Sequence, residues 1–410
     1  MKRRLFTILM KSGISKSLFV LLSLGYASLS YAQADSARYD RPSLCLMMIA
    51  RPDMAYSSEI EEVFRQMDMP ERFNNHGLGV RVFKVPQDGK AATVAIESFA
   101  RHAEVAKKMI SKWFCRDKAT GCFNTSLLQE RGMYNTTIPD VTVAMHTIRG
   151  KALLEDAGEK LVGHTFLVVN EFKYEKHFSA TKVKSDSQKN VRGQIDLSNQ
   201  ADLDAFNENV HGGDLLRDFA ISCTSYLYQL VWNEEVAGTF YNSYYAPYGS
   251  PDAQKSQAFL QDKETFRLEY IGSNTDKLSE RNTQKLSTPK LVKKVCVRIV
   301  DKNIACLQHQ FPQFRIKALL MAGNEEAPFK AYVGLKEDIT PDSRFEVLEP
   351  ELHEDGTYTY KRVGVIKPLP NKIWDNRYMA TDDQPAELDA TYFELVSGND
   401  LYPGLVIREM

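Results

Sequence analysis

Short apolar runs alternate with longer amphipathic stretches through the first part of the chain. Residues 44–49 are apolar on both faces and are bounded by Pro42 and Pro52, which indicates a buried strand. Residues 57–67 and 93–114 carry apolar side chains at helical spacing, so each predicts one amphipathic helix. Further helical and strand-like stretches follow, and this alternation predicts an α/β layer domain over residues 33–175.

The pattern changes twice after this domain. Residues 176–213 are rich in Lys, Ser, Asp, Asn and Gln and predict a polar linker or a long excursion. Residues 214–290 are β-rich, and residues 217–249 predict a long hairpin that turns at residues 233–235. Alternate positions would then form two faces, one with Phe219, Ile221, Cys223, Leu227 and Val231, the other with Tyr226, Tyr228, Leu230 and Trp232.

The last part, residues 291–410, predicts a βαβ lead-in and a small β-barrel. Residues 291–300 are expected to form a strand, followed by a short helix capped by Asp301. About five further strand candidates favour a closed or half-open barrel. The stretch GLKEDITPDSRFEVLE, residues 334–349, is expected to be its first hairpin, with a charged tip that projects outward. The fold class is therefore expected to be α+β.

The N-terminal residues resemble an export signal. Lys2, Arg3 and Arg4 precede an apolar run, and Ser30-Tyr31-Ala32 fits the small-x-small cleavage rule, so residues 1–32 predict a signal peptide. The run is shorter than the roughly 20 residues of a membrane-spanning helix, and no second long apolar span follows. We therefore expect an exported chain without a transmembrane segment after cleavage, in the periplasm, associated with the outer membrane, or secreted.

Charge and cysteine content narrow the partners and the covalent chemistry. The 52 basic and 53 acidic residues nearly cancel, so no nucleic-acid partner is expected. Six cysteines in an exported chain permit disulfides. Cys115 and Cys122 close a short polar loop and are the candidate disulfide, with two free thiols as the alternative.

Motifs of known catalytic chemistry are missing from the sequence. HExxH, GxSxG, the Walker loop and GxGxxG do not occur, and adjacent carboxylates such as Glu234-Glu235 are typical of a solvated surface. No catalytic, cofactor-binding or metal-binding residue is therefore predicted, and no cofactor is expected, although weak enzymatic activity is left open.

Aromatic residues supply the only candidate binding positions. Tyr and Trp on the predicted hairpin could stack on a glycan or a protein partner, whereas burial in the core is the favoured alternative because strands are enriched in aromatics. A second aromatic segment, residues 374–378, would be either a recognition loop or a plug for one end of the barrel. The candidates are Tyr226, Tyr228, Trp232, Tyr241, Tyr244, Trp374 and Tyr378.

Three resemblances follow from these segments. FKAYVGLKEDITPDSRFEVLE is similar to the C-terminal barrel of flagellar assembly protein T, with Pro341-Asp342-Ser343 in place of the usual Gly-Asp. The order of elements from KWFCRDKATGC to VGHTFLVVNEF is similar to that of curli-secretion-type periplasmic domains. The whole chain also resembles uncharacterised exported proteins of Bacteroidota, in which Asp35-Ser36-Ala37 would match an O-glycosylation sequon. These resemblances imply an envelope setting and no catalytic residues.

Two functions follow from the sequence. The favoured one is a non-enzymatic exported protein that acts through protein–protein contacts with an envelope partner, in envelope or surface assembly. The alternative is a glycan- or peptide-binding protein, or a hydrolase, that uses the aromatic face of the hairpin.

Overall fold

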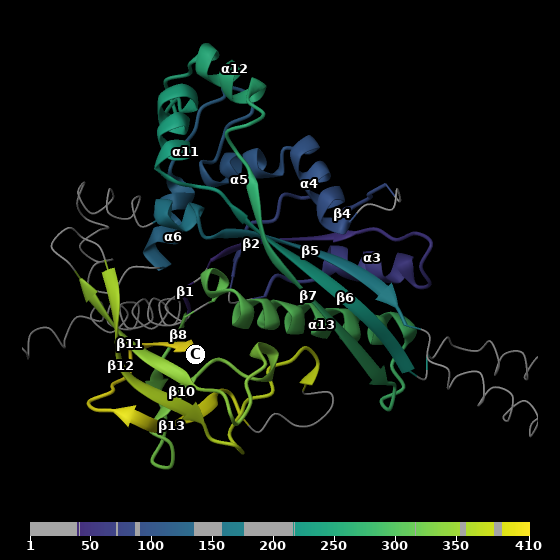
Figure 1. Cartoon of the computed structure of the whole chain (residues 1–410), viewed down its shortest axis with the longest axis vertical. Coiled ribbons are helices and arrows are strands. Elements are labelled where there is room, and N and C mark those ends of the chain that lie inside the picture. Colours follow the sequence, from purple (N-terminus) through teal and green to yellow (C-terminus); the bar gives the residue numbers. More distant parts are fainter. Residues whose placement is uncertain are drawn as a thin grey trace, which may run out of the picture.

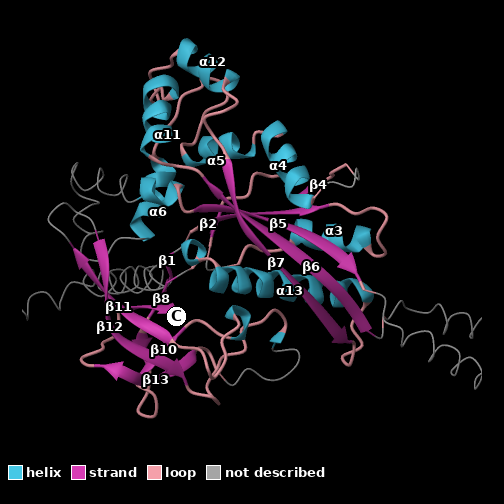
Figure 2. Ribbon diagram, in the orientation of Figure 1, coloured by secondary structure: helices cyan, strands magenta, loops and turns pink. Residues whose placement is uncertain are grey.

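Two β-sheets organise the chain, and together they confirm the predicted combination of an α/β layer and a C-terminal barrel (Figures 1 and 2). The predicted signal peptide and the whole polar stretch 176–213 lie outside the described residues. The computed structural model describes residues 39–40, 42–70, 73–86, 91–134, 158–175, 216, 218–315, 317–352, 358–380 and 388–410.

The N-terminal sheet is mixed and has the order β3-β2-β5-β6-β7, with β4 also paired to β2. Its central strand β2 (Ser43–Ile49) is buried throughout, as expected for a parallel strand covered on both faces. Its parallel neighbours are β3 (Asn74–Asn75), β4 (Val82–Phe83) and β5 (Thr165–Tyr174). The antiparallel strands β6 (Asp218–Leu230) and β7 (Leu268–Arg281) extend this sheet, so the β-rich segment 214–290 continues the N-terminal layer.

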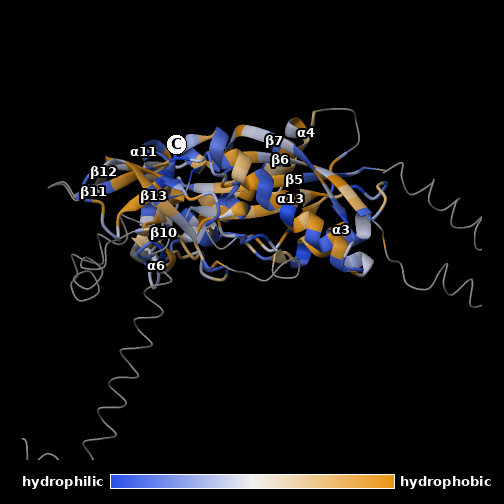
Figure 3. Ribbon diagram, turned by 90° about the horizontal axis from the view of Figure 1, so that it is seen from below, coloured by the Kyte–Doolittle hydropathy of each residue, from blue (hydrophilic) through white to orange (hydrophobic). Residues whose placement is uncertain are grey.

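Helices cover both faces of this sheet because successive residues of each buried strand point to opposite sides. One face packs on α3 (Ser57–Gln66) and α13 (Thr288–Gln310). Seen from below, α3 and α13 lie along the same side of β5, β6 and β7 (Figure 3). The other face packs on α4 (Ala92–His102), α5 (Val105–Trp113), α6 (Ser126–Tyr134), α11 (Glu234–Thr239), the π-helical turn η1 (Phe240–Tyr244) and α12 (Ala253–Gln261).

Three predictions about these helices were wrong. The stretch predicted as a strand over 291–300 and a short helix after Asp301 is one helix of 23 residues, α13, with Asp301 in its interior. Its Val and Ile content resembles a strand, but Leu291, Val295 and Ile299 recur every four residues and are fully buried against the sheet.

The predicted hairpin over 217–249 is also absent, since β6 ends at Leu230 and pairs with β7 instead. Asn233, expected in the turn, is the N-cap of α11, and its side-chain oxygen accepts from the Val236 N–H at 3.0 Å. The single helix predicted over 93–114 is interrupted between α4 and α5, where Glu104 has a φ of 51°.

The C-terminal sheet is antiparallel, with the order β1-β8-β14-β11-β12-β13-β10-β9. Because β8 pairs with β14 while β9, one residue further on, pairs with β10, the segment 317–322 joins both ends of the sheet and nearly closes the barrel. Phe345 and Phe393 pack edge to face inside it, 5.2 Å apart. The strands are β1 (Tyr39–Asp40), β8 (Lys317–Leu319), β9 (Met321–Ala322), β10 (Phe329–Ala331), β11 (Phe345–Leu352), β12 (Tyr358–Pro368), β13 (Thr391–Gly398) and β14 (Val406–Glu409).

The barrel is docked on α13 through the segment that was expected to project outward. After Gly334 the chain forms the 3₁₀ turn η3 (Leu335–Glu337), and Lys336 Nζ lies 3.8 Å from Asp301 Oδ2 of α13. Ile339 is 2% exposed, so the tip is held by burial as well as by charge. A second 3₁₀ turn, η2 (Pro312–Phe314), connects α13 to the barrel.

Candidate functional site

Among the described residues, the helices on the second face pack on only part of the sheet. Polar side chains, of which Lys173, Thr275 and Lys277 are exposed, occupy the remaining part, here called the open face. Cross-strand register aligns these side chains in two rows. The first row is Glu171, Thr224 and Thr275, and the second is Lys173, Ser222 and Lys277. The Thr224 and Thr275 hydroxyls are 2.8 Å apart, and Lys277 Nζ lies 3.3 Å from Glu175 Oε1. The opposite side of these strands carries the apolar residues that pack on α13.

The outer edge of β7 borders the open face. β7 has 14 residues and stands last in the strand order, and no strand among the described residues pairs with its outer edge. An unpaired edge presents backbone N–H and C=O groups that can pair with another chain. This edge and the open face therefore form one continuous polar surface, which we treat as the candidate interaction site.

An ion pair marks the boundary between the open face and the helix-covered part. The guanidinium of Arg51 contacts Glu171 through two nitrogens, with Nε 3.1 Å from Oε1. The Tyr226 hydroxyl donates to the other carboxylate oxygen at 3.2 Å. Burial and the neighbouring Glu171 charge both raise the pKa of Tyr226, so its hydroxyl stays protonated as a donor.

Two further tyrosines adjoin this group. Tyr228 is 1% exposed, and its hydroxyl has no hydrogen-bond partner in the part of the chain that the structure describes. Burial, followed by the charge of Glu97, raises its pKa. Its ring lies 5.3 Å from that of Tyr270, which is 40% exposed. The sequence patterns singled out Tyr226 and Tyr228 but missed Arg51, Glu171 and Tyr270. Of these three, only Tyr270 is itself an aromatic residue in the segment predicted to be β-rich, and this signal could have found it.

The other predicted aromatics of the middle segment gather around Phe114 and Phe240. Trp232 is half-buried, with its ring 5.5 Å from that of Phe114. Tyr241 donates to Glu159 at 3.1 Å, and the Tyr244 hydroxyl lies 3.1 Å from that of Thr265. These rings pack on the same apolar core as Tyr226 and Tyr228, on the helix-covered face of the sheet. Trp232 and Tyr241 contact Phe114 and Phe240 and not the Arg51–Glu171 pair.

The predicted aromatic loop of the barrel lies between η3 and α13. The Trp374 carbonyl accepts from the Leu335 N–H at 3.0 Å, and the Tyr378 carbonyl accepts from Arg298 Nε at 3.0 Å. Lys293 Nζ stands 5.6 Å from the centre of the Tyr378 ring. A Cβ on Gly334 would lie 2.2 Å from the Trp374 oxygen, so the close approach of these segments requires glycine there.

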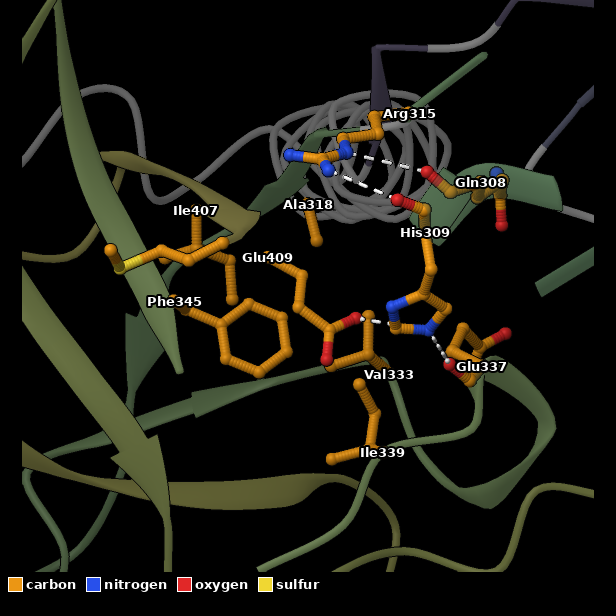
Figure 4. Close-up of a pocket in the computed structure, with 11 residues that line it drawn as sticks. Gln308, His309, Arg315, Ala318, Val333, Glu337, Ile339, Phe345, Ile407 and Glu409 are labelled. Atoms are coloured by element: carbon orange, nitrogen blue, oxygen red, sulfur yellow. Dashed lines mark hydrogen bonds and ion pairs between the residues drawn. The ribbon is translucent and has the colours of Figure 1, made fainter. Parts of the chain in front are cut away.

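A cavity of about 50 Å³ lies between the end of α13 and the barrel (Figure 4). His309 and Glu409 project into it from opposite sides, with Nε2 and Oε2 3.4 Å apart. The same His309 nitrogen is 3.4 Å from the Glu337 carbonyl oxygen. Arg315 donates to the carbonyls of Gln308 and His309 and so caps the last turn of the helix. Val333, Ile339, Phe345 and Ile407 supply apolar walls.

The candidate disulfide is not formed in this structure, where all six cysteines are free. Cys115 Sγ lies 3.5 Å from the Ser126 hydroxyl and 3.8 Å from the Lys112 carbonyl oxygen. Cys122 is buried at the other end of a loop that Asp117 organises by accepting from the N–H groups of Ala119 and Thr120. Side-chain hydrogen bonds therefore hold this loop.

Among the described residues, no group of three or more His, Cys, Asp and Glu side chains could hold a metal ion. Within the same part of the chain, every helix is too short or too polar to cross a bilayer. No protein-family model matches the chain, and no curated protein matches its sequence. The fold and the geometry of the surface therefore carry the functional argument.

Proposed function

We propose that this chain is a non-enzymatic exported protein of the cell envelope that works through protein–protein contacts in envelope or surface assembly. The observation that supports the proposal is the outer edge of the 14-residue strand β7, which lies beside the open face. No strand among the described residues pairs with this edge. A partner would add an extended segment along this edge, where main-chain hydrogen bonds give affinity and side chains of the open face select the sequence.

The two faces of β7 carry charges of opposite sign in the part that crosses α13. Asp276 and Glu280 point toward α13, where they contact Lys302 at 2.7 Å and Lys294 at 3.1 Å. The opposite side of the strand presents hydroxyl and basic side chains, namely Thr275, Lys277, Ser279 and Arg281. This composition favours a partner segment with acidic and hydroxyl side chains, because opposite charges directly across a strand pair stabilise it.

Site-specific photo-crosslinking in cells that produce the tagged chain tests the proposal. A crosslinking residue at Thr275 or Ser279 is expected to capture the same envelope protein, identified by mass spectrometry. The matched control position is Ser397, which is exposed on β13 of the barrel. Equal capture of that protein from Ser397, or no capture from either β7 position, would contradict the proposal.

A substitution separates a specific edge contact from general stickiness. Thr275→Glu places a negative charge among the hydroxyl and basic side chains of β7, where it repels an acidic partner segment, and should reduce recovery of the partner at least tenfold. Ser397→Glu makes the same kind of change on the barrel and should leave recovery unchanged. Circular dichroism of both variants shows whether the fold is intact.

A second candidate function, glycan binding, is favoured by one observation. Tyr270 exposes 40% of its surface next to Tyr228 and near Tyr226, whose hydroxyl donates to Glu171, an arrangement that suits stacking on a sugar. Tyr270→Ala should then abolish binding to an envelope-glycan panel, whereas Tyr248→Ala, at a 75% exposed position, should not. Unchanged binding by Tyr270→Ala would remove this candidate.

A further inference from the structure

Besides the Lys336–Asp301 contact, two further contacts hold the junction between the barrel and α13. At one, the Arg298 guanidinium and Lys293 engage Tyr378 of the loop before β13. At the other, His309 of α13 meets Glu409 of β14 across the wall of the cavity in Figure 4. The first contact uses a backbone carbonyl and an aromatic ring, whereas the second joins an imidazole and a carboxyl group. In the second contact, binding of a proton changes which of the two side chains can donate a hydrogen bond to the other.

We propose that His309 and Glu409 form a proton-dependent latch, which tightens the barrel against the end of α13 as the pH falls below neutrality. One proton on either side chain is sufficient. A protonated Glu409 donates to a neutral imidazole nitrogen, and a protonated His309 donates to the Glu409 carboxylate. Without that proton, the carboxylate is only partly exposed to water and competes with the Glu337 carbonyl for one ring nitrogen.

Burial of Glu409 gives this direction, and it outweighs the neighbouring groups, most of which act against it. His309 from α13 and Arg315 from the segment after η2 favour its ionised form, as does the hydroxyl of Ser343 from the loop before β11. Asp338, which follows η3, opposes ionisation. Burial is the largest effect, and the pKa of Glu409 is raised above the ordinary value of 4.5.

The sign of the pH effect follows from proton linkage. A raised pKa means that the closed junction binds a proton more tightly than an open junction, where Glu409 is in water. Closing is therefore favoured at low pH, and this advantage is lost as the pH rises through the raised pKa of Glu409. The effect falls in the pH range directly above 4.5, where the equilibrium between closed and open junctions changes up to about tenfold for each pH unit.

Hydrogen exchange of the full chain at pH 4.5 and pH 7.5, corrected for intrinsic rates, tests the latch. Amides of β14 and of the last turn of α13 should be several-fold better protected at pH 4.5. Glu409→Gln should abolish the difference, and His309→Gln should reduce it. Glu394→Gln is the control, because Glu394 is paired with Lys367 on the outside of the barrel at 2.9 Å. A wild-type chain without a pH difference, or a Glu409→Gln variant that keeps it, would overturn the proposal.

Discussion

The guanidinium of Arg51 and the carboxylate of Glu171 form an ion pair between residues 120 positions apart in the chain. The pairing of β2 with β5 brings them to the carboxyl ends of parallel strands, where open α/β sheets place their binding crevices. The pair also fixes Tyr226, whose hydroxyl donates to the second oxygen of Glu171. One nearly buried carboxylate thus links the helix-covered sheet to its open face.

Glu171→Gln should lower the free energy of unfolding by about 2 kcal/mol, since it removes charged hydrogen bonds from a carboxylate that is 7% exposed. Urea unfolding followed by circular dichroism measures the change. Glu269→Gln, at an exposed position on β7, should shift the midpoint little. Equal effects of the two variants would mean that the ion pair adds no stability.

Two Tyr→Phe substitutions should act in opposite directions. Tyr228→Phe removes a buried hydroxyl that bonds to none of the described residues, and it should leave stability unchanged or raise it by about 1 kcal/mol. Tyr244→Phe removes a hydroxyl that contacts Thr265 and should lower stability by about 1 kcal/mol. Thermal unfolding of both variants provides the comparison, and a destabilised Tyr228→Phe variant would reveal a partner for that hydroxyl.

Gly334→Ala should destabilise the barrel by about 2 kcal/mol, because the new methyl would lie 2.2 Å from the Trp374 oxygen and 2.7 Å from Asn376 Oδ1. Gly238→Ala is the matched control. Its Cβ on α11 meets no described atom within 4 Å, and alanine favours helix. Its stability should stay equal or rise. Proteolysis of the barrel under native conditions reads out the difference, and equal resistance of the two variants would refute the steric argument.

Asn303→Ala should cost about 3 kcal/mol, because Asn303 is fully buried and connects α13 to the sheet. Its amide nitrogen donates at 2.9 Å both to the Cys223 carbonyl and to the Ser225 hydroxyl. Gln310→Ala, near the end of the same helix and exposed, removes one hydrogen bond to Asn274 and should cost little. The measurement is again equilibrium unfolding, and a tolerated Asn303→Ala would show that water replaces the network.

Thiol alkylation should follow burial. Burial raises the pKa of Cys45 to about 11 and that of Cys223 to about 12, so both remain protonated at pH 8. Half-buried Cys115 should therefore react first in the native chain, and Cys45 and Cys223 only after unfolding. Mass spectrometry of a time course with iodoacetamide checks the order. Native Cys223 reacting as fast as Cys115 would show that the core opens readily.

The local pattern of apolar and polar residues correctly predicted those helices and strands whose burial follows one simple pattern along their length. The run at β2 is apolar at every position and α3 has a clear apolar stripe, so each predicted its own burial. The strand candidates in residues 291–410 likewise predicted the C-terminal barrel from their local patterns. Export, an envelope setting and the partner remain predictions from the sequence.

Contacts between distant residues decided the remainder. The sheet buries the Val- and Ile-rich face of α13, so a segment with the composition of a strand forms a helix. Strand β6 pairs with β7, although the helices α11 and α12 lie between them in the chain. Tyr226 and Tyr228 point to one side of β6 and the residues that pack on α13 point to the other, and Trp232 joins the first side because its ring packs on Phe114. The Arg51–Glu171 pair, the closure of the barrel by residues 317–322 and the His309–Glu409 contact have no local pattern. Each depends on chain segments that meet only after folding, and sequence spacing carries no record of such contacts.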